Sequence, residues 1–231
     1  MNPTRYRIVP RDVNAHLFEV DCTVDDPAAS GQRFVLPSWT PGSYLIRDFA
    51  RHVVAARATS GGRPVAIAKT AKDTWLAAPC AGPLTVTIDV YAYDLSVRTA
   101  YLDPSRGYFN GTSVFLCPEG RAHASCTVEI VAPRDPSAAR WRVATTLSRE
   151  GAAPWGFGLY GARDYDQYTQ NVSRVWEASA QVDHHLGHHT LTGGLELLSE
   201  ILSSPRLSTG RAQHIRGAAL IQDEWAIAQL K

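Results

Sequence analysis

The first two thirds of the chain alternate apolar and polar residues with a period of two. Residues 15–24 (AHLFEVDCTV), 84–93 (LTVTIDVYAY) and 125–131 (SCTVEIV) show the pattern most clearly. Such alternation is typical of β-strands that have one face in a core and the other in solvent. From residue 5 to about residue 160 the sequence therefore predicts a series of short strands.

Turn-forming pairs separate these apolar runs. They are Asp25-Asp26-Pro27, Pro41-Gly42, Gly61-Gly62, Gly82-Pro83, Asp103-Pro104, Asn110-Gly111 and Pro118-Glu119-Gly120. Asn-Gly favours a type I′ turn, so residues 108–116 are predicted to form a β-hairpin around it. Many short strands joined in this way predict a mainly β fold, a two-sheet antiparallel β-sandwich or saddle over residues 1–166.

The pattern changes after about residue 166. Alternation stops, and Leu191, Leu195, Leu198 and Leu202 recur at helical spacing. A second amphipathic stretch follows Arg211. Residues 167–231 are therefore predicted to form a C-terminal helical tail of one or two helices packed on the β domain, or a weakly ordered segment.

Composition narrows the class of protein and its partners. The 231 residues are 45% hydrophobic and 19% charged, which is typical of a globular chain rather than a disordered one. A formal net charge of +1 with scattered Lys and Arg indicates no nucleic-acid or anionic-membrane partner. No run of about 18 apolar residues occurs, and the start lacks the apolar core of a secretion signal. We therefore expect a cytoplasmic protein without a membrane segment.

The four cysteines, Cys22, Cys80, Cys117 and Cys126, form no CxxC pair. This spacing indicates neither a zinc ribbon nor a thioredoxin-type redox site. Cys22 and Cys126 fall on the apolar side of alternating segments. We therefore interpret both as small hydrophobic core residues.

The stretch LPSWTPGSYLIRDF, residues 36–49, combines a tight turn with several aromatic residues. Pro41 and Gly42 suit the central positions of a type II turn, which requires a positive φ at the glycine. Ser43 is placed to cap a short helical turn over residues 46–49.

Two interpretations of this stretch stay open at the level of sequence. Trp39, Tyr44 and Phe49 would brace a corner between two sheets, because aromatic rings bury large apolar areas. Alternatively, the Tyr44 hydroxyl, together with Arg47 or Asp48, would face a partner or a substrate.

Several segments carry a family resemblance. They are PSWTPGSYLIRDFARHV (37–53), Trp75 in KDTW, YAYDLSVRTAYLD (91–103), GYFNGTSVFL (107–116), WRVATTL (141–147) and LYGARDYD (159–166). In this order they resemble the N-terminal domain of the glycyl-aminopeptidase family of zinc metallopeptidases. The resemblance implies an all-β domain that packs over a thermolysin-like catalytic domain, usually followed by a PDZ domain.

The chain departs from that family after Asp166. The family's catalysis requires a HExxH helix, in which two histidines hold zinc and the glutamate polarises water, and the sequence contains no HExxH. No catalytic residue is therefore assigned, and no cofactor is expected in this chain, although the parent family uses zinc. Residues 167–231 are expected to be either a frameshifted or truncated ending or a genuine alternative tail.

A histidine cluster offers a weak substitute for the missing metal motif. His184 and His188, like His185 and His189, have the i,i+4 spacing that holds a metal on a helix. The glutamate base is missing, however, and Gly187 disfavours a helix by about 1 kcal/mol. A surface histidine cluster is the favoured interpretation.

We therefore expect a non-catalytic N-terminal domain that caps or scaffolds a catalytic domain or another partner and does not hydrolyse peptides alone. The alternative is a stand-alone β-sandwich module that binds peptide or carbohydrate near Tyr44 or Tyr101. Apolar surface left bare by a missing catalytic domain would also permit self-association.

Overall fold

The computed structural model describes residues 2–40, 45–165, 173–186, 189–203 and 211–225, the last three ranges as backbone. The chain divides into two compact units, Met1–Gln170 and Asn171–Lys231, and each is described by itself. The prediction of a mainly β protein is confirmed, because strands form nearly all of the regular structure.

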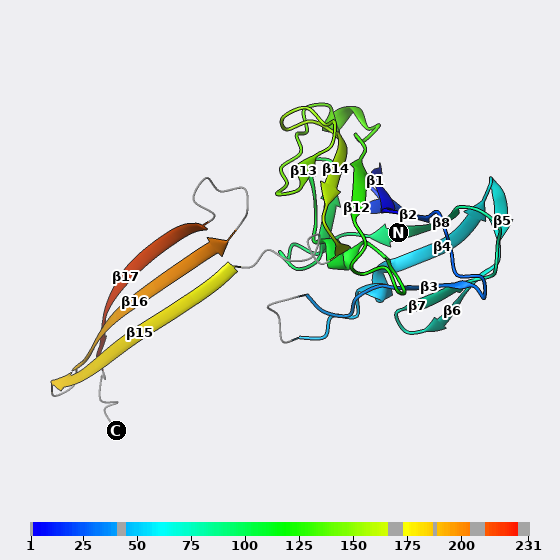
Figure 1. Ribbon diagram of the computed structural model, residues 1–231. Helices are drawn as coiled ribbons and strands as arrows, with labels where there is room; N and C mark the ends of the chain where they lie inside the picture. The colour runs from blue at the N-terminus through cyan, green and yellow to red at the C-terminus, as the bar shows by residue number, and fades with distance from the viewer. Residues whose placement is uncertain (1, 41–44, 166–172, 187–188, 204–210, 226–231) are drawn as a thin grey trace, which may run out of the picture. The chain divides into compact units, whose positions relative to one another are not determined.

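The largest element of the first unit is a sheet of eight strands in the order β13-β14-β12-β1-β2-β8-β4-β5 (Figure 1). Its strands are β1 (Thr4–Asp12), β2 (Leu17–Val24), β4 (Val53–Ser60), β5 (Arg63–Val65), β8 (Leu84–Tyr91), β12 (Cys126–Ile130), β13 (Ser148–Arg149) and β14 (Gly158–Ala162). The prediction of a purely antiparallel sheet is wrong at one place, since β1 and β12 pair in parallel. The long connection from β1 to β12 makes this possible, because a parallel pair cannot be joined by a tight hairpin.

A second sheet has the order β11-β3-β7-β6, and a separate hairpin pairs β9 with β10. These strands are β3 (Gln32–Val35), β6 (Ile67–Ala71), β7 (Thr74–Ala77), β9 (Ala100–Asp103), β10 (Arg106–Phe109) and β11 (Cys117–Pro118). Three short 3-10 helices complete the described part of this unit: η1 (Phe49–His52), η2 (Gly111–Ser113) and η3 (Pro136–Ala138).

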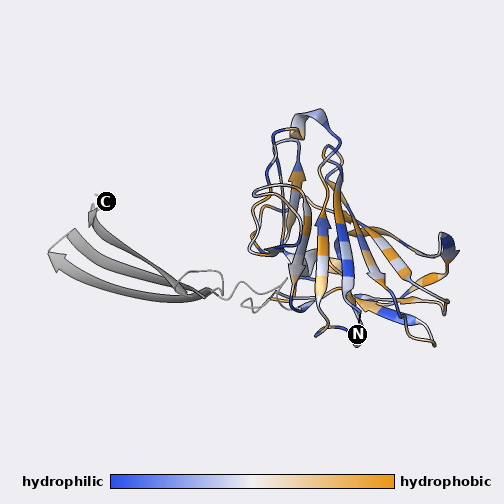
Figure 2. Ribbon diagram, turned by 45° about the horizontal axis from the view of Figure 1, so that its top comes forward, coloured by the Kyte–Doolittle hydropathy of each residue, from blue (hydrophilic) through white to orange (hydrophobic). Residues whose placement is uncertain are grey.

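The core lies between the two larger sheets. Along β2, alternate residues from Phe18 to Val24 are buried, and β3 and β7 contribute Phe34 and Trp75 to the same cluster. Figure 2 shows the resulting alternation of hydrophobic and hydrophilic bands along the strands. The three strands expected from alternation are present as β2, β8 and β12, with somewhat narrower bounds.

Cys22 and Cys126 are buried in this core, as predicted. Burial raises the pKa of the Cys126 thiol to about 12 and that of Cys22 well above its ordinary value. Both thiols are therefore protonated near neutral pH and act as small apolar groups.

The opposite face of the large sheet carries ion pairs that join its strands. Asp89 lies between Arg11, at 2.7 Å, and Arg57, at 3.3 Å. Arg57 also binds Glu19 at 2.6 Å. The Asp89 side chain is 9% exposed, so these arginines neutralise a carboxylate that has lost most of its water.

Asn110-Gly111 does not form the predicted type I′ hairpin. Asn110 has a φ of −90°, and its side-chain oxygen accepts the Thr112 N–H, so that it caps η2. Residues 110–116, which we call the strap, then cross the core. The strap is tied to the first strand by the Tyr6 hydroxyl, which donates to the Leu116 carbonyl at 2.8 Å.

The second unit is a three-stranded antiparallel sheet of β15 (Ser173–Leu186), β16 (His189–Ser203) and β17 (Arg211–Trp225). The predicted C-terminal helical tail is therefore wrong. Gly193 and Gly194 lie inside the leucine-rich stretch, and each disfavours a helix by about 1 kcal/mol. A spacing of four residues, as from Leu191 to Leu195, also keeps two residues on one face of a strand, so it did not discriminate between the two structures.

The ion pairs of Asp89 generate a stability prediction. Asp89→Ala leaves two arginines beside a mostly buried position without their carboxylate, and we expect it to lower the free energy of unfolding by about 1–3 kcal/mol. Urea unfolding followed by circular dichroism measures the change. Asp26→Ala, in an exposed turn, is the control and is expected to change stability by less than about 0.5 kcal/mol. Equal effects of the two substitutions would contradict the role given to Asp89.

The β9–β10 turn generates a prediction about pH. The Oδ1 atom of Asp103 accepts hydrogen bonds from the Ser105 hydroxyl and from the Ser105 and Arg106 backbone N–H groups, and its Oδ2 accepts the Tyr101 hydroxyl. The Ser105 hydroxyl and these further donors hold the pKa of Asp103 well below its usual range, against the opposing effect of burial.

A lowered carboxyl pKa stabilises the fold above the ordinary value near 4, and this contribution is lost as the pH falls toward the folded-state pKa. Between pH 5 and pH 2 we expect the free energy of unfolding to fall less steeply in Asp103→Asn than in the wild type. Urea titrations at several pH values measure both slopes. Identical slopes would show that Asp103 ionisation does not stabilise the fold.

Candidate functional site

Large apolar side chains are exposed at Trp39 and at Leu45–Ile46, which we call the first loop. The two parts are joined by the Arg47 N–H, which donates to the Ser38 carbonyl at 2.7 Å. Trp39 is 53% exposed, Leu45 64% and Ile46 76%. Apolar residues gathered in this way on one loop are typical of a binding surface. Pro41, Gly42 and Tyr44, predicted as a type II turn and a partner-facing residue, lie outside the described residues.

The end of this stretch is fixed by the core. Phe49 is fully buried and begins η1, whereas the sequence predicted a helical turn already at residue 46. Asp48 precedes η1 with a left-handed φ of 49°, which keeps the helical turn from starting earlier. Its carboxylate binds the Lys72 ammonium group at 2.5 Å. Phe49 therefore braces the fold, whereas Trp39 faces solvent.

A second loop, residues 94–99, adds to the exposed apolar surface. Leu95 and Val97 are each 70% exposed. The loop is held by the Thr99 hydroxyl, which donates to the Asp94 carbonyl at 2.9 Å, and by the Tyr108 hydroxyl, which donates to the Val97 carbonyl. Its two apolar side chains are thus presented on a backbone that hydrogen bonds keep in place.

The two loops are neighbours, and we call them together the apolar loop pair. The Thr40 hydroxyl donates to the Arg98 carbonyl at 3.5 Å and lies 3.3 Å from the Thr112 hydroxyl of the strap. The strap also holds Tyr165, whose hydroxyl donates to the Phe115 carbonyl at 2.6 Å. The last described residue of the first unit is thus attached to the same strap that supports the loop pair.

Arg47 lies at the base of the first loop with an unusual environment. Its Nε atom is buried and has no hydrogen-bond partner among the described residues. A buried donor left unsatisfied costs about 1–3 kcal/mol, and such groups call for a specific explanation.

Tyr101, the other predicted partner-facing residue, is buried at 8% exposure. Its hydrogen bond to Asp103 raises the pKa of Tyr101 to about 12. Its ring stacks on Tyr93 at 5.2 Å, and Tyr93 is 54% exposed. The exposed ring of this stacked pair is therefore that of Tyr93, which follows β8 and which the sequence pattern assigned to an ordinary strand.

The predicted histidine cluster does not lie on a helix. His184 and His185 are consecutive residues of β15 and so fall on opposite faces of its sheet, while His189 begins β16 and His188 lies outside the described residues. In residues 2–40 and 45–165, no three His, Cys, Asp or Glu side chains are placed to hold a metal ion. Within the described chain there is also no helix long and apolar enough to cross a membrane.

Comparison with known proteins supports the resemblance seen in the sequence. The family model described as the peptidase M61 N-terminal domain matches residues 5–171. The crystal structure of an aminopeptidase N family protein from Idiomarina loihiensis is similar, with 38% identity and a TM-score of 0.69. The match covers 76% of this chain and 30% of that one, so this chain corresponds to less than a third of its neighbour. A search of curated proteins found no match. The chain thus belongs to the peptidase M61 N-terminal domain family.

Proposed function

We propose that this chain supplies the non-catalytic N-terminal domain of a zinc aminopeptidase and docks on a catalytic domain through the apolar loop pair. The observation that carries the proposal is the exposure of five large apolar side chains, Trp39, Leu45, Ile46, Leu95 and Val97, on two loops joined by a hydrogen bond. Fully burying one such side chain contributes about 1.5–3 kcal/mol, so even partial coverage by a partner would stabilise a complex.

The position of Tyr165 supports the same partner. Because the strap holds both this residue and Thr40, the last described residue of the first unit lies near the apolar loop pair. The solved neighbour has most of its length outside the matched part.

The reaction implied by the family, removal of N-terminal Gly or Ala by a zinc-bound water, belongs to the catalytic domain. The described residues of this chain do not fit the metal, since they form no cluster of three ligands. The sequence also has no HExxH. We therefore assign no step of hydrolysis to this chain, and its role in the proposal is to bind and support the domain that holds zinc.

The docking proposal predicts that this chain and a catalytic part bind each other when they are produced as separate chains. The part of the Idiomarina loihiensis protein that follows its matched segment, produced separately, is expected to bind this chain with a micromolar Kd in calorimetry. Trp39→Ser combined with Leu95→Ser removes two apolar anchors and is expected to weaken binding at least tenfold, on the order expected for anchor residues. Trp155→Ser, at a similarly exposed tryptophan (66%), is the matched control and should bind like the wild type.

Two results would refute the docking proposal. One is no detectable binding by a catalytic part that is folded by circular dichroism. The other is equal weakening by the loop variant and the control. Binding of short peptides or oligosaccharides at Tyr93 without any binding of the catalytic part would favour the stand-alone module instead.

The absence of a zinc motif predicts the result of an activity assay. Purified without a nickel column and supplied with zinc, this chain is expected to release no nitroaniline from Gly- or Ala-p-nitroanilide above a zinc blank. Turnover that scales with protein concentration and disappears with a chelator would contradict the proposal. Metal analysis of the same sample then shows whether stoichiometric zinc accompanies any such activity.

A further inference from the structure

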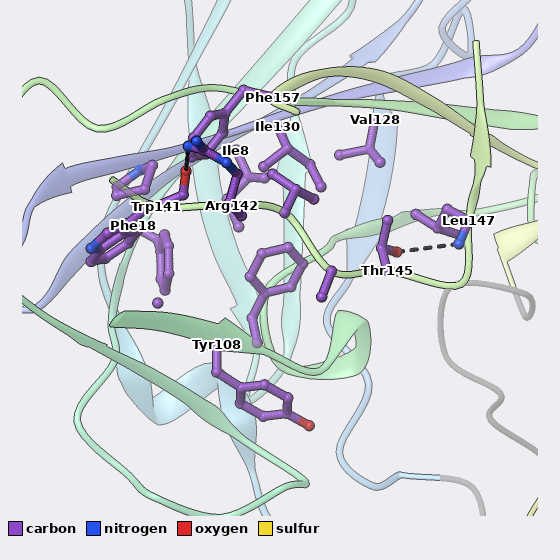
Figure 3. Close-up of a pocket in the computed structure, with 15 residues that line it drawn as sticks. Ile8, Phe18, Tyr108, Val128, Ile130, Trp141, Arg142, Thr145, Leu147 and Phe157 are labelled. Atoms are coloured by element: carbon purple, nitrogen blue, oxygen red, sulfur yellow. Dashed lines mark hydrogen bonds between the residues drawn. The ribbon is translucent and has the colours of Figure 1, made fainter. Parts of the chain in front are cut away.

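A cavity of about 190 Å³ lies at the edge of the core (Figure 3). Its floor is the inner face of the large sheet, with Ile8, Phe18 and Ile130. Its walls come from β10, with Tyr108, and from the irregular segment 141–147. We call it the aryl cavity.

The cavity exists because the second sheet does not cover this part of the large sheet. The hairpin strand β10 and the segment 141–147 cover it instead, and they leave a gap between them. Gly107 lies at this gap: a Cβ atom there would approach Trp141 to 3.0 Å and Phe18 to 3.4 Å. A side chain at position 107 would therefore press on the tryptophan ring, which forms one wall of the cavity.

The size of the cavity limits its occupant. An apolar cavity of about 150 Å³ accommodates benzene. At about 190 Å³, the aryl cavity has room for one phenyl or phenol ring. Its lining is mostly apolar and aromatic, with Phe18, Phe109, Trp141 and Phe157 available for ring contacts.

The lining of the cavity carries positive charge only. Arg142 is the only charged residue among the described residues that line the cavity, and its Nη1 donates to the neighbouring Trp141 carbonyl at 3.1 Å. No ion pair joins Arg142 to a carboxylate in the described part of the chain. Its remaining N–H donors suit the planar, bidentate geometry of a carboxylate.

From these observations we propose that the aryl cavity binds the C-terminal aromatic residue of a peptide. The ring enters the cavity, and the terminal carboxylate pairs with Arg142. A free aromatic amino acid fits less well, because no acidic side chain in the lining is present to pair with its ammonium group. This site differs from the docking surface proposed above, although Tyr108 in its wall also donates to the Val97 carbonyl of the apolar loop pair.

The test begins with four ligands titrated into the full chain: N-acetyl-phenylalanine, its amide, N-acetyl-alanine and free phenylalanine. Binding is followed through the indole N–H resonance of Trp141, assigned with Trp141→Phe. We expect N-acetyl-phenylalanine to bind with a Kd of order 1 mM or below, as its size allows. The amide and free phenylalanine should bind about tenfold more weakly, and N-acetyl-alanine should not shift the resonance. Equal affinity for the acid and its amide, or for phenylalanine with and without the acetyl group, would overturn the proposal.

Two kinds of variant separate the roles of charge and shape. Arg142→Gln is expected to weaken binding of N-acetyl-phenylalanine about tenfold while leaving binding of the amide unchanged. Gly107→Leu fills the gap and should abolish binding of both ligands. Ala144→Trp, which fills the cavity from the exposed segment, gives a second blocking variant should Gly107→Leu fail to fold. Wild-type affinity in a folded blocking variant would place the ligand elsewhere and refute the site.

Discussion

The hydrogen bond from the Tyr6 hydroxyl to the Leu116 carbonyl holds together the part of the molecule on which the candidate surface depends. Burial raises the pKa of Tyr6 well above its ordinary value, so the phenol stays a neutral donor near neutral pH. Its ring also contacts Phe115 at a centroid distance of 5.0 Å. A strap without its own sheet partners can cross the core only if buried carbonyls such as that of Leu116 find donors, because an unpaired buried carbonyl is costly. The strap in turn carries Thr112, the contact of Thr40, and so connects the core to the apolar loop pair.

The aryl cavity arises from the way in which the inner face of the eight-stranded sheet is covered. The second sheet covers one part of that face with Phe34 and Trp75 and leaves a closed core. Around β1, β2 and β12 the cover is a hairpin strand and an irregular segment, and the fit leaves the aryl cavity. The outer face does not need a cover, because ion pairs such as those of Asp89 satisfy its charges in place.

The alternation of apolar residues predicted β2, β8 and β12 well, because a strand with one buried face requires that period. Local turn rules were less reliable. Asn110-Gly111 has the sequence of a type I′ turn, yet the Asn110 side chain captures the Thr112 N–H and begins a 3-10 turn instead. The parallel pairing of β1 and β12 and the sheet in the second unit depend on contacts between distant segments, which local patterns do not encode.

The candidate surface was only partly visible in the sequence, for a related reason. Residues 36–49 stand out in the sequence because they contain several aromatic residues. Only the structure shows that Trp39 is exposed whereas Phe49 is buried. Leu95 and Val97 lie beyond the alternating run of the preceding strand and out of phase with its apolar positions, and two such residues gave no signal of their own. Tyr93 and Tyr101 both stand in strand-like sequence, which does not show which of the two rings is exposed. The fold decides that it is Tyr93.

The way the loops are held bears on how a partner would bind. The first loop is closed by a backbone hydrogen bond from Arg47 to Ser38, the second by bonds within residues 94–100, and Thr40 joins them. Leu95 and Val97, presented on a backbone held by these bonds, lose less conformational freedom on binding than side chains of an unstructured loop. A partner that covers the exposed apolar side chains of the loop pair therefore gains the burial of their area at a smaller entropic cost.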